Sequence, residues 1–360
     1  FWDAQLSVRL DSLLSNGHSR PVYDALERLY QTDLEAYGAL IEATEENAES
    51  LVIEHDGQPW QVLLVSAPMV AWTRFQIPSG PIPATVARRI NQTWREQILT
   101  PNARLHLMPV LYSVDQLPRD YGGLRKLALR LGRQAVTGES STEEQSLPDS
   151  AQMLADARFL IAAVAVPLGQ PIFRWQSIDL REQRTRVQSL EKWVEHLRPQ
   201  AESLLPGCGF ESLLPDAYHI NMRESDRRVR PYCIRAAIHY LTHVLSLDAS
   251  QIQATVGSFG YERCDEYRIG LSVDHEGEEV AHGIVWPLLG AESEHDEPPP
   301  VARIRELLVE AGVTNISQWS GVVEPEYCED CGAPLYPNRK DEVTHAQMPE
   351  DLAPDSRHFH

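Results

Sequence analysis

The sequence predicts an α/β or α+β fold in which mixed sheets are covered by helices. Stretches with apolar residues at three- and four-residue steps, typical of helices, alternate with short apolar runs bounded by turn residues, typical of strands. The same strand–helix–strand–helix order occurs twice along the chain. Because the strands are joined by both hairpins and helical crossovers, we expect mixed sheets with helices packed against them.

The first unit is predicted over residues 1–136. Asp56–Gly57 marks a hairpin turn between two of its strands, because this dipeptide adopts the positive φ angles of a tight turn. In chain order we expect helices over 2–15 and 20–46, two strands around residues 55–57, a helix over 83–97, a strand over 103–114 and a basic helix over 120–133.

A second unit is predicted over residues 151–248, after a polar linker at 137–150 that has no periodicity. Pro68 and Trp94 of the first unit recur as Pro167 and Trp193, each 99 residues later, so we infer a duplication. The elements expected here are a strand over 157–168, a helix over 180–204, a strand-like segment over 213–222 and a helix over 229–247.

Two smaller units complete the predicted organisation. Residues 249–323 form a weaker strand–strand–helix–strand repeat, with a turn at His275–Gly277 between its first two strands. Residues 324–360 form an acidic C-terminal element around a pair of cysteines. The chain is therefore predicted to consist of duplicated units with a small terminal knuckle.

The charge distribution argues against nucleic acid as a partner. The chain has a net charge of -20, although residues 80–240 hold 21 basic and 17 acidic residues, so the flanking segments carry the whole acidic excess. An excess of this sign repels nucleic acids and anionic membrane surfaces. No apolar run is long enough to span a bilayer, and we expect no membrane association.

Cysteine usage predicts a cytoplasmic protein. The five cysteines are few for 360 residues and odd in number, which favours a reducing compartment over a disulfide framework. The first residues also lack the basic and apolar regions of a signal peptide. The cysteines are Cys208, Cys233, Cys264, Cys328 and Cys331.

The segment "YCEDCGAPLYPN" holds the clearest chemical motif. Cys328 and Cys331 have the spacing of one zinc knuckle, and Gly332 allows the tight turn that brings two sulfurs to one ion. The segment resembles the first half of a zinc ribbon. We predict a structural zinc ion with His345 as third ligand, because a chain returning from the turn at 338–341 would bring it back to the knuckle. The fourth ligand stays open among His358, His360 and Cys264.

Two other interpretations of the pair stay open. The cysteines could form an inert turn without a metal. They could instead form a redox pair, which normally requires a helix N-terminus to stabilise a thiolate. Two prolines follow the pair and four acidic residues surround it, and we expect these acids to raise the thiol pKa and to oppose redox reactivity. The acidic residues are Glu324, Glu326, Glu329 and Asp330.

An arginine cluster is the candidate anion site. It is predicted to lie just before and at the start of a helix, where free backbone N–H groups and guanidinium groups could hold a phosphate or carboxylate. The alternative is a solvated face that pairs with the acidic excess of the chain. The members are Arg223, Arg227, Arg228, Arg230 and Arg235.

Other patterns are weaker. His239 and His243 share one helix face, as metal-binding pairs do, but they flank an apolar stripe and are more typical of a core boundary. Cys208 lies between two glycines, and Gly207 suits a helix C-cap. The P-loop, nucleophile-elbow and HExxH patterns do not occur in the sequence, which weakens the corresponding hydrolase interpretations.

The stretches "AHGIVWPLLG" (281–290) and "YCEDCGAPLYPN" (327–338) resemble an uncharacterised bacterial family known only as a domain of unknown function. The resemblance implies a bacterial, cytoplasmic origin and carries no catalytic residues. With no catalytic constellation in the sequence, we expect a non-catalytic binding or scaffold protein that can form a homo-oligomer. The alternative is an enzyme that acts on a small anionic substrate held by the arginine cluster.

Overall fold

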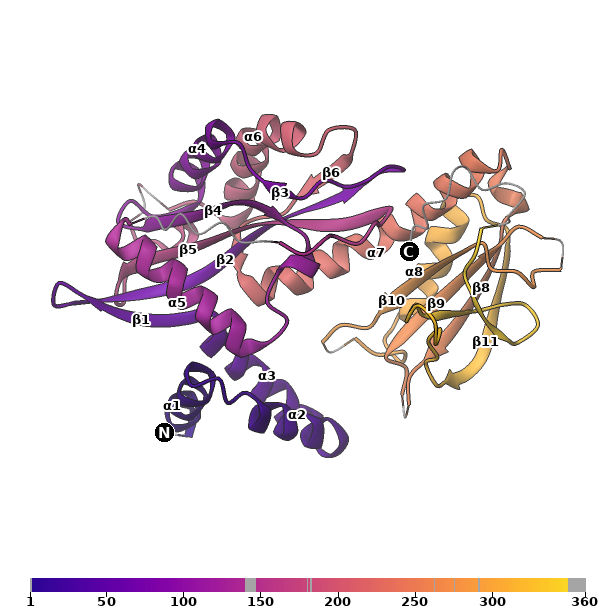
Figure 1. Cartoon of the computed structure of the whole chain (residues 1–360), viewed down its shortest axis with the longest axis horizontal. Helices are drawn as coiled ribbons and strands as arrows, with labels where there is room; N and C mark the ends of the chain where they lie inside the picture. The colour runs from indigo at the N-terminus through magenta and orange to yellow at the C-terminus, as the bar shows by residue number, and fades with distance from the viewer. Residues whose placement is uncertain are drawn as a thin grey trace. The chain divides into compact units, whose positions relative to one another are not determined.

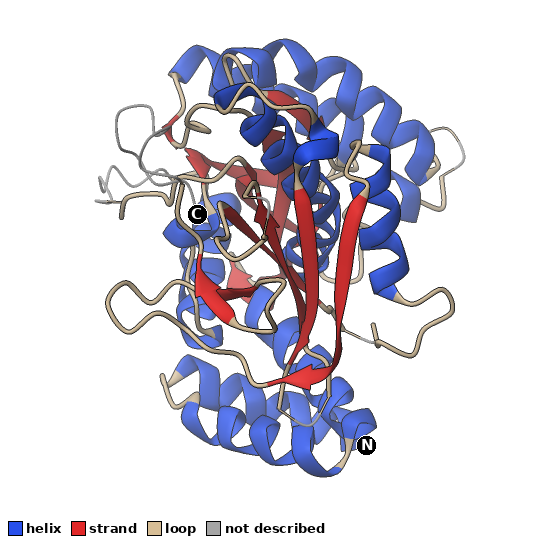
Figure 2. Ribbon diagram, turned by 90° about the vertical axis from the view of Figure 1, so that its right-hand side faces the viewer, coloured by secondary structure: helices blue, strands red, loops and turns tan. Residues whose placement is uncertain are grey.

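The computed structural model confirms a mixed α/β fold (Figures 1 and 2). It describes residues 2–139, 147–179, 181, 183–261, 263–274, 276–290 and 292–348. Half of the predicted linker (140–146), His275 of the predicted third-unit turn, and His358 and His360 lie outside the described residues.

The chain divides into two compact units, which we describe separately. Unit 1 comprises Phe1–Val70, Pro78–Ser150 and Ala157–Ser225. Unit 2 comprises Ala71–Ile77, Ala151–Asp156 and Asp226–His360. The four domain ranges predicted from the sequence and the inferred duplication stay predictions.

Unit 1 is built on one sheet with the strand order β1-β2-β5-β4-β3, and β6 and β7 pair with β2. Strand β5, from the predicted second unit, lies between β2 and β4 of the predicted first unit. Segments from both predicted units therefore contribute to the one sheet of structural unit 1. The strands are β1 (Ser50–His55), β2 (Gln58–Trp72), β3 (Gly80–Pro81), β4 (Arg104–Tyr112), β5 (Ala155–Pro167), β6 (Gly209–Ser212) and β7 (Asp216–Ala217).

The hairpin between β1 and β2 is formed as predicted. Their pairing is antiparallel and closes at His55 and Gln58. Asp56 and Gly57 have φ angles of 52° and 73°. Two positive φ angles in a two-residue connection match the right-handed twist of the flanking strands, which explains why this dipeptide marks the turn.

Helices cover both faces of the unit 1 sheet (Figure 1). On one face, Leu124 and Ala128 of α5 (Tyr121–Thr137) pack with Trp60 and Val62 of β2. On the other face lie α4 (Ala84–Thr93), continued by the π-helical turn Trp94–Ile98, and α6 (Arg186–Leu204). Trp94 and Trp193, the matching tryptophans of the sequence, are fully buried and meet edge to face with ring centroids 5.5 Å apart.

The predicted helix over 20–46 is wrong as a single element. It is divided into α2 (Arg20–Thr32) and α3 (Leu34–Glu49), which follow α1 (Trp2–Ser15). Asp33 between them is extended, with φ -157°, and its carboxylate accepts a hydrogen bond from Ala36 N at 3.0 Å. A capping aspartate thus ends one helix and begins the next without interrupting the apolar periodicity.

The strand-like prediction for residues 213–222 is largely wrong. Only Asp216–Ala217 is a strand, and α7 begins at Tyr218 and continues to Val244. Glu49 of α3 accepts a hydrogen bond from the backbone N–H of His219 at 2.8 Å. This carboxylate satisfies one of the free N–H groups in the first turn of α7. Because the cap comes from 170 residues away, local sequence does not reveal this helix start.

Unit 2 contains a sheet with the strand order β10-β9-β8-β11. Apolar side chains of this sheet pack against α7 and α8. Its strands are β8 (Gln253–Phe259), β9 (Glu266–Ser272), β10 (His282–Pro287) and β11 (Asn315–Val323), and α8 is Pro300–Glu310. Strands β8 and β11 are parallel, while β9 pairs antiparallel with both its neighbours. Strand β8 was not predicted, so the predicted third unit has one strand more than its assigned pattern.

A small hairpin of β12 (Leu335–Pro337) and β13 (Val343–His345) packs against this sheet. Gly270 and Gly283, which are register partners on β9 and β10, allow its close approach. A Cβ atom at Gly270 would lie 2.2 Å from Pro337 O, and one at Gly283 would lie 2.2 Å from the Tyr336 ring. The two glycines therefore make room for the C-terminal hairpin.

Candidate metal centre

The knuckle turn has the backbone geometry that the sequence predicts. Cys328 N donates to Ala333 O at 2.8 Å, and Gly332 N donates to Cys328 O at 2.8 Å. Gly332 has a φ of 74°, a conformation that glycine adopts without strain. The turn reverses the chain between Cys328 and Ala333. Both thiols therefore lie close together on the same side of the turn.

The hairpin β12–β13 brings His345 to this turn. Leu335 and His345 are register partners, so the histidine lies beside the residue at which the chain leaves the knuckle. Asn338 holds the hairpin turn, because its Oδ1 accepts hydrogen bonds from Lys340 N at 2.8 Å and from Glu342 N at 3.0 Å. The return strand thus places the histidine where the sequence predicted it.

The ligand atoms of Cys328, Cys331 and His345 all lie within 4.8 Å of one another. Cys331 Sγ and His345 Nε2 are 3.2 Å apart. Zinc–sulfur and zinc–nitrogen bonds of about 2.3 and 2.0 Å separate tetrahedral ligands by roughly 3.5 Å. The three side chains therefore form a group compatible with a metal site.

Backbone donors determine the electrostatics at Cys328. The backbone N–H groups of Cys331 and then Asp330 hydrogen-bond its sulfur and lower its pKa. The negative charge of Asp330 acts in the opposite direction but has the smaller effect. Asp330 therefore raises the thiol pKa of Cys328 as expected, but the hydrogen bonds outweigh it, and the turn favours the thiolate that a metal requires.

The fourth ligand is not among the described residues, where the group has three members. The candidate Cys264 is not one of them. It is buried before β9, where its thiol donates a hydrogen bond to Glu266 O at 3.4 Å, and burial raises its pKa. The other two candidates, His358 and His360, lie outside the described residues.

The arginine cluster occupies the interior of α7, which spans Tyr218–Val244. The prediction that these residues precede and begin a helix is therefore wrong, and the backbone N–H groups there are used within the helix. In unit 1, Arg223 Nη1 donates to Glu45 Oε1 at 2.6 Å. Arg223 thus already has a carboxylate partner.

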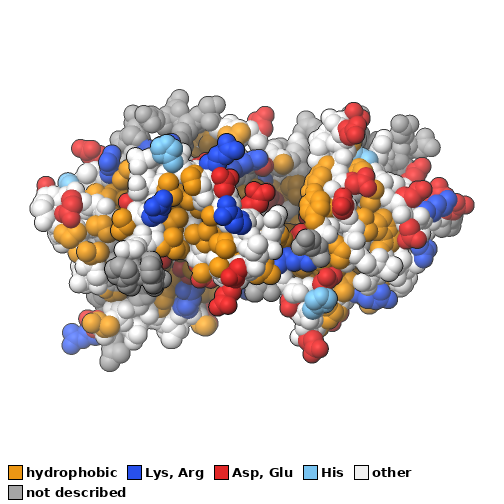
Figure 3. Space-filling view, turned by 90° about the horizontal axis from the view of Figure 1, so that it is seen from below, with side chains coloured by type: hydrophobic (Ala, Val, Ile, Leu, Met, Phe, Trp, Pro, Cys, Tyr) orange, Lys and Arg blue, Asp and Glu red, His pale blue; other side chains and the backbone are white. Residues whose placement is uncertain are grey.

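In unit 2 the other arginines also contact acidic residues. Arg230 donates to both oxygens of Glu292, at 2.7 and 2.9 Å, and to Pro287 O at 2.6 Å. Arg227 Nε lies 3.7 Å from Glu292, and Arg235 donates to Glu310 at 3.1 Å. Arg228 also has an interaction partner. On the face shown in Figure 3, basic side chains likewise lie beside acidic ones.

The histidine pair on α7 is not part of a metal group among the described residues. The rings of His239 and His243 are stacked with centroids 6.4 Å apart. His243 Nε2 lies 2.6 Å from Arg74 Nη1, so this ring nitrogen is already used as a hydrogen-bond acceptor. This contact disfavours metal binding by the pair.

A buried polar cluster in unit 1 was missed by the sequence reasoning. The buried Glu45 and Glu49, one turn apart on α3, pair with Arg223 and His219, one turn apart on α7. Burial and the nearby Glu45 raise the pKa of Tyr121 to about 12. In the segment "EENAE", Glu45 and Glu49 lie one helical turn apart on the apolar face. They were the available sequence signal for this cluster, because buried carboxylates require partners.

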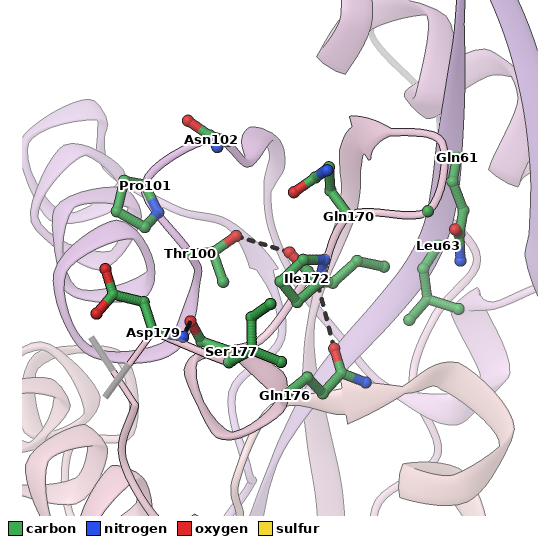
Figure 4. A pocket seen from close by; sticks show the side chains of 13 residues that line it. Gln61, Leu63, Thr100, Pro101, Asn102, Gln170, Ile172, Gln176, Ser177 and Asp179 are labelled. Atoms are coloured by element: carbon green, nitrogen blue, oxygen red, sulfur yellow. Dashed lines mark hydrogen bonds between the residues drawn. The ribbon is translucent and has the colours of Figure 1, made fainter. Parts of the chain in front are cut away.

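A cavity of about 800 Å³ opens on unit 1 (Figure 4). In this view Gln61 and Leu63 of β2 lie on one side, and Asn102 and Asp179 lie on the other. No lysine or arginine is among the residues that line it. The cavity therefore lacks the side chains that usually bind a phosphate or carboxylate.

A comparison with known protein families assigns the chain to one of them. A family model described as protein of unknown function (DUF2863) matches residues 1–359. The chain belongs to this family. The resemblance predicted from residues 281–290 and 327–338 is thereby confirmed. No curated protein and no solved structure matches this DUF2863 chain. Within its described residues, no helix is long and apolar enough to cross a membrane.

Proposed function

We propose that the protein is a non-catalytic binding or scaffold protein whose C-terminal element is stabilised by a zinc ion. The convergence of Cys328, Cys331 and His345 carries the proposal. Thiolate and imidazole ligands suit zinc, whereas magnesium and calcium prefer oxygen ligands. The lowered pKa of Cys328 supports the same assignment.

The proposed role of the ion is structural. The side chains of residues 329–332 are exposed, so the tip of the knuckle has little apolar surface to bury. A metal that joins the turn to His345 would supply the cross-link that packing does not, since the free energy of metal binding also stabilises the folded site.

Metal analysis of the purified protein tests the proposal. We expect about one zinc ion per chain in the wild type and strong loss of zinc in Cys328→Ser. Cys208→Ser is the matched control, because it removes a cysteine outside the group and should retain the ion. A folded wild-type protein that takes up no zinc from a zinc-containing buffer would contradict the proposal.

Two observations support a binding role over an enzyme that uses the arginine cluster. Each of Arg223, Arg227, Arg230 and Arg235 lies beside a carboxylate, and no basic residue is among the described residues that line the cavity of unit 1. Thermal melting in phosphate and citrate, with Arg227→Ala/Arg228→Ala as comparison, tests this choice. We expect equal shifts for both proteins. Selective stabilisation of the wild type would favour the enzyme.

We also propose a bacterial, cytoplasmic protein that forms a homo-oligomer and does not bind nucleic acid. None of the five cysteines forms a disulfide bond, as in a reducing compartment, and the net charge of -20 disfavours polyanions. Light scattering after size-exclusion chromatography measures the mass of the assembly. A mass equal to one chain across micromolar concentrations would exclude the oligomer.

A further inference from the structure

Arg268 of β9 is fully buried and contacts both ends of the segment 327–334, which contains the two cysteines of the candidate metal site. Its Nη1 donates to Glu326 O at 2.6 Å and to Leu335 O at 2.8 Å. These two carbonyls stand immediately before and after the segment 327–334 that contains both cysteines. Leu335 N also donates to Glu326 O at 3.0 Å. One guanidinium group thus closes the base of the knuckle.

Aromatic rings and a carboxylate hold this guanidinium in place. It lies between the rings of Phe259 and Tyr327, at 4.7 and 4.9 Å from their centroids. Its Nε donates to Glu266 Oε1 at 2.6 Å. A buried charge is costly unless it is paired and hydrogen-bonded, and these contacts offset much of that cost. Nη2 has no hydrogen-bond partner among the described residues. A lysine could not reproduce all of these contacts, because its single ammonium group would have to reach both carbonyls and Glu266 at once.

The contacts of Arg268 connect the two parts of the chain that supply ligands. Tyr327, stacked on the guanidinium, directly precedes Cys328. Leu335, whose carbonyl accepts from Arg268, is the register partner of His345. The arginine therefore controls the separation between the cysteine turn and the strand that carries the histidine, although it touches no ligand atom.

We propose that Arg268 is a positioning residue that pre-organises the Cys328–Cys331–His345 site before the metal binds. This inference rests on the proposed zinc site. Residues that orient metal ligands from outside the coordination sphere typically change affinity by about 10–100-fold when they are replaced. The ligand atoms lie within 4.8 Å of one another in a knuckle whose base is closed by the two carbonyl contacts of Arg268.

Two variants of Arg268 and two matched controls test the proposal. Arg268→Met removes both carbonyl contacts, and Arg268→Lys retains the charge without the fork. The controls Trp319→Phe and Arg339→Met remove contacts that anchor the same hairpin at its other end. There Trp319 Nε1 donates to Asn338 O at 3.0 Å, and Arg339 donates to Gln253 and Asn315 at 2.6 and 2.9 Å.

The readouts are zinc affinity, measured by competition with a chromogenic chelator, and the visible absorption spectrum of the cobalt-substituted protein. We expect Arg268→Met to weaken zinc binding by about 10–100-fold and Arg268→Lys to weaken it less. Both variants should alter the cobalt spectrum, which reports ligand geometry. Each control should bind zinc within about twofold of the wild type and keep its spectrum.

Wild-type zinc binding in folded Arg268→Lys would overturn the inference, even if Arg268→Met does not fold. Equal weakening in the two controls would also overturn it, since the effect would then come from general loosening of the hairpin. A wild-type protein that binds no zinc would instead contradict the proposed function. The two failures are therefore distinguishable.

Discussion

Helix α7 and the C-terminal knuckle both carry many polar side chains, but these side chains have different kinds of partner. On α7, Arg230 meets the carboxylate of Glu292, so opposite charges neutralise each other within the protein. In the knuckle, two thiols and an imidazole converge without a cationic side chain among the group. Deprotonated ligands at this spacing repel one another, and a bound cation removes the repulsion.

The difference indicates which region is compatible with a metal ion. Charges that are already paired, as on α7, gain little from an added ion. The thiols and the imidazole of the knuckle lie close enough together to hold one. Sequence composition marks both regions as unusual, and only the spatial neighbours distinguish them.

The largest expected effect lies at the knuckle. Cys331→Ser should weaken zinc binding by more than about 100-fold, because a direct ligand contributes more than the outer residues that orient it. Isothermal titration with a competing chelator measures this affinity. The apolar cluster of unit 2 should stay folded, as its near-ultraviolet circular dichroism would show. Unchanged affinity would exclude Cys331 as a ligand.

The second effect concerns the paired arginines of α7. Arg230→Met should lower the free energy of unfolding by about 3 kcal/mol, because it removes the buried partner of both Glu292 oxygens and leaves only the longer contact to Arg227 and the N–H of Leu289. The side chain of Arg230 is only 8% exposed, whereas that of Arg235 is 46% exposed. Arg235→Met should therefore cost less than about 1 kcal/mol in the same urea titration. Similar losses for both would contradict the assigned difference in burial.

A smaller loss is expected where α3 caps α7. Glu49→Gln removes the negative charge that accepts from the N–H and the Nδ1 of His219, at 2.8 and 2.9 Å. We expect a loss of about 1 kcal/mol in the free energy of unfolding, because the amide keeps one acceptor. The exposed Glu46 is the matched control, and Glu46→Gln should leave stability unchanged. A neutral result at Glu49 would remove the cap from the explanation of the helix start.

The smallest effect is a pH dependence at Glu292. Burial raises its pKa, but hydrogen bonds from Arg230 and Leu289 N outweigh burial and leave the pKa below its usual value. A depressed folded-state pKa contributes stability above the unfolded value, and this stability is lost as pH falls through the folded value. Glu292→Gln should therefore flatten the stability profile below about pH 5. An identical acid limb in both proteins would contradict the pairing.

Local sequence was sufficient wherever one short segment carries the whole signal. The Asp56–Gly57 turn requires positive φ angles and has them. The knuckle depends on a two-residue spacing and a following glycine, so Cys328 and Cys331 could be assigned directly. His345 could be predicted because a hairpin returns the chain over only a few residues.

Sequence reasoning failed where a distant residue decides the structure. The start of α7 depends on Glu49 from α3, and the arginines were assigned to the start of a helix, whereas they lie in the interior of α7. Strand β8 was missed although it pairs with both β9 and β11. Neither Gly270 nor Gly283 signals that a hairpin packs over it until the sheet is assembled.

The sequence by itself determined the mixed α/β class, the resemblance to a family of unknown function and the grouping of Cys328, Cys331 and His345, because periodicity, motif spacing and turn chemistry act over a few residues. The tertiary structure alone decided that Arg230 faces a carboxylate and that Arg268 closes the base of the knuckle. Both outcomes depend on which side chains meet across the fold. Such meetings are set by burial and pairing over the whole unit, and no local pattern encodes them.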